Sequence, residues 1–490
     1  MKNEIPNRNL KIYGKGDNFL KADYKKLGKN TLLFAIGSFA QKAMSFVFVP
    51  FYTAILTTSD YGVSDLIITI TTMLWSFFTL MINDAVLRFS LDKQADKSQV
   101  ISIGLYVNFI GTLLMILLSP IILPITNLQD YRYYFIAYYI AYMLSSFFSY
   151  ALRGMELTKL FSITGVLNTG IAIFCNIVFL LVLKLGLKGY LLSFIVAYTV
   201  TAVVQFIAGG FPKYLVNPVK ISKAKLIEMI GYSVPLVPNS ISWWLSNSAN
   251  KVILSNVCGV AANGLYSVAF KVPTIITVCS SIFSNAWQIS AVEGFGTEEN
   301  RRYYSDIYYK YSTTCMFLVS GIIAFNKLIC RILFSKDFYS AWVFVPVLLY
   351  AVSYQIMSGF LGTIYTTAKK TKMVFFSTVA AAVCNIALSS ILIPYMAGMG
   401  AAISTCISYF IIWLIRVFDS RKIMVLDVNW RKETVCNLLI LLQVVLGCFD
   451  SKICLLLCVL ILLSVLYIKR DFLTDLYKLL HNRIRTKERG

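Results

Sequence analysis

Long apolar runs separated by short polar segments recur along the whole chain. The first run, Thr31 to Leu56, would rise about 39 Å as a helix at ~1.5 Å per residue, enough to cross a bilayer. Within it, Ser38, Gln41, Lys42 and Ser45 recur at spacings of three and four residues, which places them on one helical face. This first helix is therefore predicted to have one polar face.

Lys42 lies near the middle of that run, where a charged side chain costs at least ~2.5 kcal/mol unless water or a partner meets it. From mid-depth it cannot easily reach the headgroups. We therefore predict that Lys42, with Gln41 beside it, binds substrate in a water-filled, cation-lined cavity within the membrane.

The same pattern predicts an all-α integral membrane protein with fourteen transmembrane helices. An even number places both termini on one side, and most of the 45 Lys and Arg residues then lie on that side, which the positive-inside rule makes the cytoplasm. The expected spans are 31–56, 62–90, 99–125, 132–153, 160–183, 189–211, 227–254, 265–292, 306–334, 342–368, 373–393, 399–418, 434–449 and 453–468.

Two short patterns return in the same order in the second half of the chain. Cys175-Asn176-Ile177 returns as Cys384-Asn385-Ile386, and the spacing of Gly189, Ser193 and Tyr198 returns as Gly400, Ser404 and Tyr409. Because six spans separate the copies, the repeat is of the parallel kind, with two similar six-helix lobes around a central cavity. The expected organisation is a basic cytoplasmic segment 1–30, an N-lobe 31–211, a cytoplasmic linker 212–226, a C-lobe 227–418, two further helices in 434–468 and a basic cytoplasmic tail 469–490.

Polar stripes also mark three later spans that we expect to line the cavity. The second span carries Thr69, Thr72, Ser76, Thr79 and Asn83 and ends at Asp84 and Arg88; the seventh carries Asn239, Trp243, Asn247 and Lys251; the eighth carries Lys271, Asn285 and Gln288. These residues from Arg88 to Gln288 are predicted to bind substrate, with Pro235 and Pro238 as a gating bend in the seventh span.

Three of the charged residues have a second interpretation. Arg88 could instead form an ion pair with Asp84 one helical turn away. Lys251 and Lys271 could extend to the outer headgroups, because both lie toward the outer ends of their helices.

Composition narrows the function classes. With 58% hydrophobic residues and a net charge of +22, the chain has the make-up of a polytopic membrane protein, and no basic patch carries the interleaved aromatics of a nucleic-acid site. The 11 cysteines show no metal-ligand spacing, His481 is the only histidine, and no phosphate-binding glycine loop occurs. We expect no catalytic residues, metal or cofactor. The missing phosphate-binding loop excludes ATP hydrolysis by the chain itself as the energy source, and it leaves a membrane potential or an ion gradient open.

The charges predicted deep within the spans are mostly positive, which favours an anionic substrate. Lysines, amides, hydroxyls and tryptophans dominate the polar stripes, and acids are few and lie near helix ends. Such a cavity suits an anion with many hydroxyls, such as a sugar carried on a phosphate or pyrophosphate.

Several short motifs resemble one family. They are 38–42 (SFAQK), Tyr61-Gly62, 86–89 (VLRF), 232–238 (YSVPLVP), Asn250-Lys251, 264–271 (GLYSVAFK) and Ala286-Trp287. Together they resemble bacterial polysaccharide transporters, the repeat-unit flippases of the multidrug/oligosaccharidyl-lipid/polysaccharide (MOP) superfamily. The chain departs from the family where relatives have an Asp-Arg pair, since Asn250-Lys251 stands there.

The resemblance implies a function in the bacterial cell membrane. Two lobes would rock to give alternating access and move an undecaprenyl-pyrophosphate-linked oligosaccharide to the outer leaflet for cell-surface polysaccharide assembly. Its implied partners are that lipid-linked glycan, membrane lipid, and a polysaccharide polymerase and glycosyltransferases of the same pathway.

Three alternatives stay open. A lipid II flippase of peptidoglycan synthesis would also need a basic cavity, and only a substrate test distinguishes it from a repeat-unit flippase. A MATE-like cation or drug antiporter would need a deep acid, which the first and seventh spans lack. A membrane glycosyltransferase or polymerase would need larger outer loops than this sequence offers.

Overall fold

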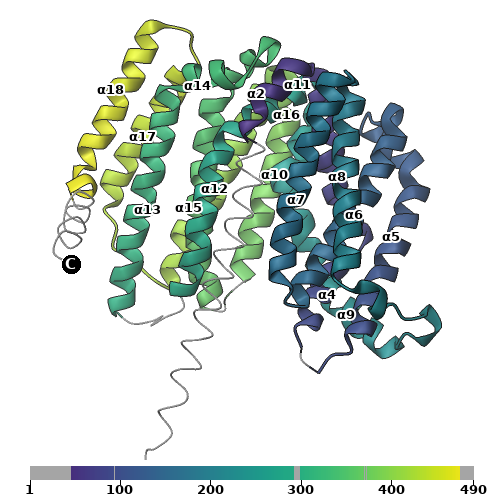
Figure 1. Cartoon of the computed structure of the whole chain (residues 1–490). Coiled ribbons are helices and arrows are strands. Elements are labelled where there is room, and N and C mark those ends of the chain that lie inside the picture. The colour runs from purple at the N-terminus through teal and green to yellow at the C-terminus, as the bar shows by residue number, and fades with distance from the viewer. Residues whose placement is uncertain (1–45, 93, 292–297, 369, 371, 475–490) are drawn as a thin grey trace, which may run out of the picture.

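The computed structural model describes residues 46–474, apart from 93, 292–297, 369 and 371, and these residues form helices without strands (Figure 1). Of the first predicted span, only the last part, α2 (Val49–Ile55), is among them. Gln41 and Lys42 lie outside the described residues, and so does the cavity wall that they were expected to form.

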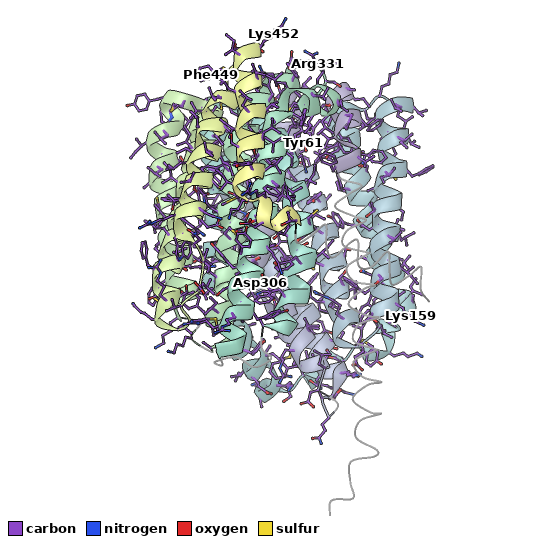
Figure 2. The ribbon with its side chains drawn as sticks, turned by 90° about the vertical axis from the view of Figure 1, so that its left-hand side faces the viewer. Tyr61, Lys159, Asp306, Arg331, Phe449 and Lys452 are labelled. Carbon is purple, nitrogen blue, oxygen red and sulfur yellow. The ribbon has the colours of Figure 1, made fainter. Side chains whose placement is uncertain are left out.

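The helices run between two ends of the molecule (Figures 1 and 2). We call the end that carries Arg331 and Lys452 the upper end, and the end that carries Lys159 and Asp306 the lower end (Figure 2). The helices in the first half are α3 (Thr58–Phe78), α4 (Ile82–Ser90), α5 (Lys97–Ile125), η1 (Gln129–Tyr131), α6 (Arg132–Gly154), α7 (Thr158–Asn176), the π-helical η2 (Ile177–Val182) and α8 (Gly186–Ala208).

The connecting segment holds the short turns η3 (Phe211–Tyr214) and η4 (Pro218–Lys220). The second half comprises α9 (Lys223–Ser233), η5 (Val234–Leu236), α10 (Val237–Cys258), α11 (Val260–Ala269), α12 (Lys271–Ser290), α13 (Glu298–Ala324), α14 (Asn326–Leu333), η6 (Lys336–Val343), α15 (Val345–Thr367), α16 (Lys372–Asp419), η7 (Ser420–Lys422), α17 (Trp430–Gly447) and α18 (Lys452–Ile468).

Within the described residues, 7 helices are long and apolar enough to cross a membrane, or 9 if each of two bent pairs counts as one span. This measure does not reach the expected fourteen. One reason is that α18, at 17 residues, is shorter than the usual span. Another is that α16 counts once although it holds two helices. The second expected span, 62–90, is two helices, α3 and α4, of which α3 is counted.

The break in that span lies at Leu80 and Met81, which both take the left-handed conformation with φ of 53°. Bulky residues rarely adopt it, so packing must hold the break in place. Gly111 of α5 allows this packing, because a Cβ there would lie 2.2 Å from the carbonyl oxygen of Phe78. Below the break, Asn108 of α5 donates a 2.8 Å hydrogen bond to the side chain of Asn83 in α4.

Most of the polar stripe of α3 is buried. The stripe therefore does not line a water-filled cavity along the whole helix. Thr72 donates to the carbonyl of Thr69, Ser76 to that of Thr72, and Thr79 to that of Trp75. Ser and Thr hydroxyls often satisfy themselves on their own helix in this way, which leaves them free to pack against neighbours. The expected water-facing stripe in this span is therefore wrong for Thr69, Ser76 and Thr79, which are buried.

The long helix α16 contains two helices that fold back on each other. Ala397 has non-helical dihedrals of φ 46° and ψ −125°. A Cβ on Gly400 would lie 2.5 Å from the carbonyl oxygen of Leu392, whereas residues this far apart in a continuous helix are separated by about 12 Å. The expected spans 373–393 and 399–418 lie on either side of this turn.

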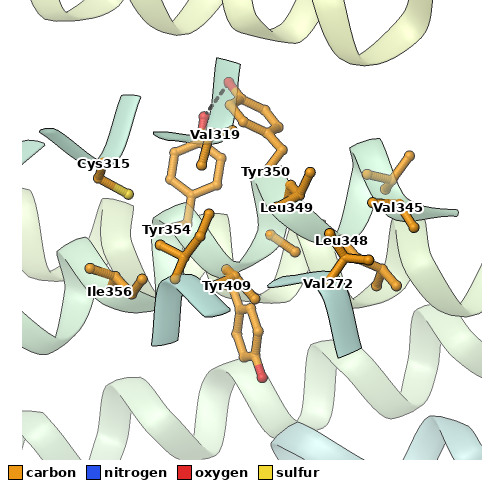
Figure 3. Packing of buried hydrophobic residues seen from close by; sticks show 14 of the residues in the cluster. Val272, Cys315, Val319, Val345, Leu348, Leu349, Tyr350, Tyr354, Ile356 and Tyr409 are labelled. Carbon is orange, nitrogen blue, oxygen red and sulfur yellow. Dashed lines mark hydrogen bonds between the residues drawn. The ribbon is translucent and has the colours of Figure 1, made fainter. Parts of the chain in front are cut away.

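One apolar cluster fills most of the second half and continues into the first half at Tyr61 and Tyr190. Val319, Val345, Tyr354 and Tyr409 are among its buried side chains (Figure 3). In it, the hydroxyl of Tyr354 donates to the hydroxyl of Tyr350 over 2.6 Å (Figure 3). The helices α17 and α18 pack on α13, and Gln443 joins all three by donating to the carbonyls of Ser320 and Cys458.

Candidate functional site

A polar cluster near the upper end joins the first half of the chain to the second. Asp65 of α3 receives hydrogen bonds from Lys251 Nζ at 3.0 and 3.1 Å and from Ser267 Oγ at 2.7 Å. Asn263 donates to the carbonyl of Gly62 at 3.1 Å and lies 3.5 Å from Asp65. We call Asp65, Lys251, Asn263 and Ser267 the upper cluster.

The upper cluster is largely sealed from solvent. The side chains of Lys251 and Asp65 are only 17% and 15% exposed. A charge pair in this setting is costly to separate, because either partner alone would leave an uncompensated charge in a poorly solvated place. The cluster therefore fixes α10 and α11 against α3.

The backbones of α3 and α11 touch just above this cluster. A Cβ on Gly62 would lie 1.9 Å from the carbonyl oxygen of Val260, and one on Gly264 would lie 1.9 Å from that of Thr58. Only glycine permits such an approach, as in the small-residue contacts of other membrane helices. No passage runs between α3 and α11 at this point.

These contacts correct one interpretation of the lysines. Lys251 does not extend to the upper surface, because its ammonium is bound to Asp65. Lys271, at the start of α12, is half-buried. Asp65 is thus the acidic partner of Lys251. The sequence shows Asn250-Lys251 where relatives have an Asp-Arg pair, and from the sequence Asp65 is grouped with the acids near helix ends.

The side chain of Asn250 is bound to two neighbouring helices. Its amide donates to the hydroxyl of Tyr266 at 2.7 Å and to that of Thr405 at 2.8 Å, and its side chain is fully enclosed. These bonds hold α10, α11 and α16 together beside the upper cluster. Trp244, lower on α10, adds a 2.9 Å bond from its indole nitrogen to the carbonyl of Thr69.

The other predicted site residues are scattered. Arg88 is exposed on α4, and within the described part of the chain it forms no ion pair with Asp84. Asn239 and Trp243 are exposed on α10. The side chains of Asn247, Asn285 and Gln288 lie outside the described residues.

The prolines of the predicted gate lie where α9 meets α10. Pro235 is in the 3-10 turn η5 that separates the two helices, and Pro238 is in the first turn of α10. The seventh span is thus interrupted at its lower part, while its function as a gate stays a prediction.

A polar cavity of about 380 Å³ lies among α6, α7 and α8, with Trp75 of α3 beside it. Helices α6 and α7 each pack along α8 but touch each other over a shorter stretch, and this leaves the space between them. Its lining comes from the lower halves of these helices: Tyr142, Ser145, Ser146, Ser149, Tyr150, Phe161, Ser162, Thr164, Gly165, Asn168, Thr169, Tyr198, Thr201 and Gln205.

Hydrogen bonds organise the wall of this polar cavity. Gln205 donates to Ser149 at 3.0 Å and to Thr164 at 3.1 Å, which ties α8 to both neighbours, and Asn168 donates to Thr201 at 3.2 Å. The Oε1 of Gln205 and the Nε1 of Trp75 are buried without a hydrogen-bond partner among the described residues.

The polar cavity offers hydroxyls, amides and aromatic rings, and none of the described residues that line it is charged. This set recognises a neutral ligand with many hydroxyls, because hydroxyls and amides both donate and accept while rings cover apolar faces. Sequence analysis missed this cavity, although Tyr142, Ser145, Ser146, Ser149 and Tyr150 of α6 follow helical spacing. Each predicted polar stripe includes or ends at a charged residue, whereas this stretch of α6 carries none.

No three His, Cys, Asp or Glu side chains gather into a metal-holding group within residues 46–474, the gaps set aside.

Comparison with known proteins identifies the type of fold. Residues 27–287 match the sequence family described as polysaccharide biosynthesis protein. An uncharacterized membrane protein of Methanocaldococcus jannaschii is 22% identical over 419 residues, which cover 81% of this chain and 98% of that protein.

Two solved structures have the same architecture. An inward-facing MATE multidrug resistance transporter of the MOP superfamily superposes with a TM-score of 0.62 at 13% identity, covering 78% of this chain and 94% of that one. The lipid II flippase MurJ, in an inward closed conformation, gives a TM-score of 0.61 at 14% identity and covers 92% and 99% of the two chains. The fold is that of MOP superfamily transporters, which are multi-pass membrane proteins.

Proposed function

This chain belongs to the polysaccharide biosynthesis protein family, and from that premise we propose that it is a flippase for an undecaprenyl-pyrophosphate-linked oligosaccharide repeat unit. It would carry the unit from the inner to the outer leaflet by alternating access, for assembly of a cell-surface polysaccharide. The polymerase and glycosyltransferases of that pathway would be its partners, and it would catalyse no chemical step itself.

The observation that carries this proposal is the polar cavity of α6, α7 and α8. Its hydroxyl, amide and aromatic lining matches a sugar, and its size of about 380 Å³ suits a small part of an oligosaccharide. A cation or drug antiporter would be favoured by an acidic residue in such a place, and the described lining has none.

We propose fourteen spans in two six-helix lobes, 31–211 and 227–418, joined by the linker 212–226 and followed by two helices in 434–468. The repeated motifs support this division, because Asn176 and Asn385 are both fully buried and Gly189 and Gly400 both sit in tight contact with the end of the preceding helix. The charge bias of the loops makes the lower end cytoplasmic, in a bacterial cell membrane.

In this orientation the upper cluster closes the outer side. Opening it requires the separation of Asp65 from Lys251 and of α3 from α11, so the cluster would act as the outer gate. The pyrophosphate of the substrate could replace Asp65 as the partner of Lys251, which lowers the cost of breaking the pair, and Lys271 would be a second cation for it. Lys42 would meet the same pyrophosphate deeper in the membrane.

A leaflet-accessibility assay in proteoliposomes tests the function directly. Asn168→Leu should reduce flipping of a lipid-linked oligosaccharide several-fold, and Ser162→Val should do so more weakly. Ser464→Val is the matched control, because Ser464 on α18, like Ser162, only donates to the carbonyl four residues before it. Full transport by Asn168→Leu would remove the polar cavity from the pathway, and full transport by Lys42→Ala would do the same for Lys42.

A lipid II flippase is the second candidate, favoured by the extent of the match to MurJ, which covers nearly the whole of both chains. Deletion of the gene separates the two. Accumulation of lipid-linked repeat units in a viable cell supports our proposal, whereas arrest of peptidoglycan synthesis with accumulation of lipid II contradicts it.

A further inference from the structure

An apolar groove of about 900 Å³ runs along the lower half of α5. It lies between α5, the end of α3, the turn η4 and helix α9. Figure 1 shows α9 at the lower end of the molecule. Its lining includes Phe77, Leu80, Ile103, Ile110, Leu114 and Ile230. Among the described residues that line it, Lys223 carries the only charge.

The groove is a built feature of the fold. Its wall at α3 is the break at Leu80, which the close approach of Gly111 to Phe78 holds in place. Without that break, α3 would continue as a straight helix, and Phe77 and Leu80 would not form this edge.

Its opposite wall, the linker, is fixed to α5 by hydrogen bonds. Ser102 donates to the carbonyl of Tyr214 at 2.8 Å and accepts from the amide of Val216, and Tyr106 donates to the carbonyl of Val216 at 2.9 Å. Gln99 donates to the carbonyl of Lys220 at 3.0 Å and accepts from the amide of Ser222. The groove therefore keeps its shape without an occupant.

The length of the groove corresponds to one leaflet. From Ile103 to Leu114, α5 rises about 16 Å at ~1.5 Å per residue, and half of the ~30 Å hydrocarbon core is about 15 Å. Ile110 and Leu114 are about half exposed on this wall. Lys223 stands at the lower mouth, at the level where an anionic headgroup meets water.

The groove and the polar cavity are both lined by residues near the end of α3. Trp75 lines the polar cavity, while Phe77 and Phe78, a few residues further along α3, line the groove. A substrate with a sugar head, a phosphate link and a long apolar tail has these same three parts.

We propose that this groove holds the isoprenoid tail of the lipid-linked substrate in the lower leaflet, with its phosphate near Lys223. The proposal rests on the proposed function. It assigns α5, the linker and α9 a function in substrate loading, which explains why the linker is bonded along α5 instead of crossing freely between the halves.

Binding of undecaprenyl phosphate to the purified full-length protein tests the proposal, measured by native mass spectrometry with phosphatidylglycerol as competitor. Ile110→Trp and Leu114→Trp should fill the groove and weaken binding at least tenfold. Leu117→Trp and Ile121→Trp are the matched controls, because both residues are exposed on the same helix and lie outside the groove. Their binding should equal that of the unmodified protein.

Lys223→Ala should weaken binding and reduce its dependence on salt, whereas Lys213→Ala, in the linker but outside the groove, should not. Equal binding by the groove variants and their controls would overturn the proposal, and so would equal displacement by phosphatidylglycerol, which would mark the groove as a site for ordinary membrane lipid. Melting temperatures of all variants show whether each one folds.

The same samples separate this proposal from the function on which it rests. Selective binding of undecaprenyl phosphate without transport of any lipid-linked glycan would leave the groove standing and contradict the flippase. Transport of the glycan that is unaffected by Ile110→Trp would contradict the groove and leave the flippase standing.

Discussion

Lys251 of α10 binds both carboxylate oxygens of Asp65 in α3, at 3.0 and 3.1 Å, and so connects two helices that are far apart in the sequence. Ser267 adds a third bond to the same carboxylate. This ion pair lies beside the glycine contact of α3 and α11. The contact among α3, α10 and α11 therefore depends both on charge and on backbone packing.

The charge component predicts a double-mutant effect. Asp65→Asn and Lys251→Gln should each destabilise the fold by about 2 kcal/mol, because each leaves the other charge without its partner in a largely enclosed place. The double variant should recover most of this loss, since neither charge is then present. Thermal unfolding in nanodiscs measures it, and additive losses in the double variant would show that the two residues are not coupled.

The packing component predicts an effect of adding one methyl group. Gly264→Ala should destabilise the contact by about 1–3 kcal/mol, because its Cβ would lie 1.9 Å from the carbonyl oxygen of Thr58 and α11 must move away. Gly321→Ala on α13 is the control, since a Cβ there meets no described atom within 4 Å. A cysteine-labelling assay at the upper end should show faster labelling for Gly264→Ala only; equal rates for the two variants would contradict the close contact.

A second ion pair, at the lower ends of α17 and α18, predicts a large effect on stability. Lys469 hydrogen-bonds to Glu433, and both side chains are buried, at 0% and 6% exposure. Glu433→Gln should cost about 3 kcal/mol or more, because it leaves a buried ammonium uncompensated. Lys432→Gln breaks only the exposed pair with Asp471 and should cost under about 1 kcal/mol. Thermal melting compares the two, and similar losses would refute this assignment.

The loop between α17 and α18 predicts a dependence on pH. The hydrogen bond and the charge of Lys327, 2.6 Å away, lower the pKa of Asp450 below its ordinary value. The pair therefore stabilises the fold at neutral pH, and this contribution disappears as the pH falls through the lowered pKa. The melting temperature of Asp450→Asn should lie slightly below that of the unmodified protein at neutral pH and equal it in strong acid. A difference that persists in acid would mean that the charge of Asp450 is not its cause.

Several elements of the fold could be read from the sequence. Apolar runs must bury or face lipid over their whole length, so the positions of α5, α6, α8 and α15 follow closely from hydropathy. Pro235 likewise marks the interruption between α9 and α10, because proline cannot donate the backbone bond that a continuous helix needs.

The break at Leu80 could not be read in this way. Leu80 is neither a glycine nor a proline, and its break depends on α5, where Gly111 lies against the carbonyl of Phe78. The site was hidden for the same reason. In the sequence, Asp65 is one residue near a helix end, and only the fold places Lys251 of α10 against it. The polar cavity likewise depends on the packing of α6 and α7 along α8 with little contact between them.

The sequence by itself determined that this chain lies in a membrane, where several of its helices fall and which of its motifs resemble a transporter family, because these properties depend on residues that are neighbours along the chain. Only the tertiary structure decided which charge meets which, where the upper end closes and where polar space remains. Those properties depend on contacts between helices whose distance in space no local pattern records.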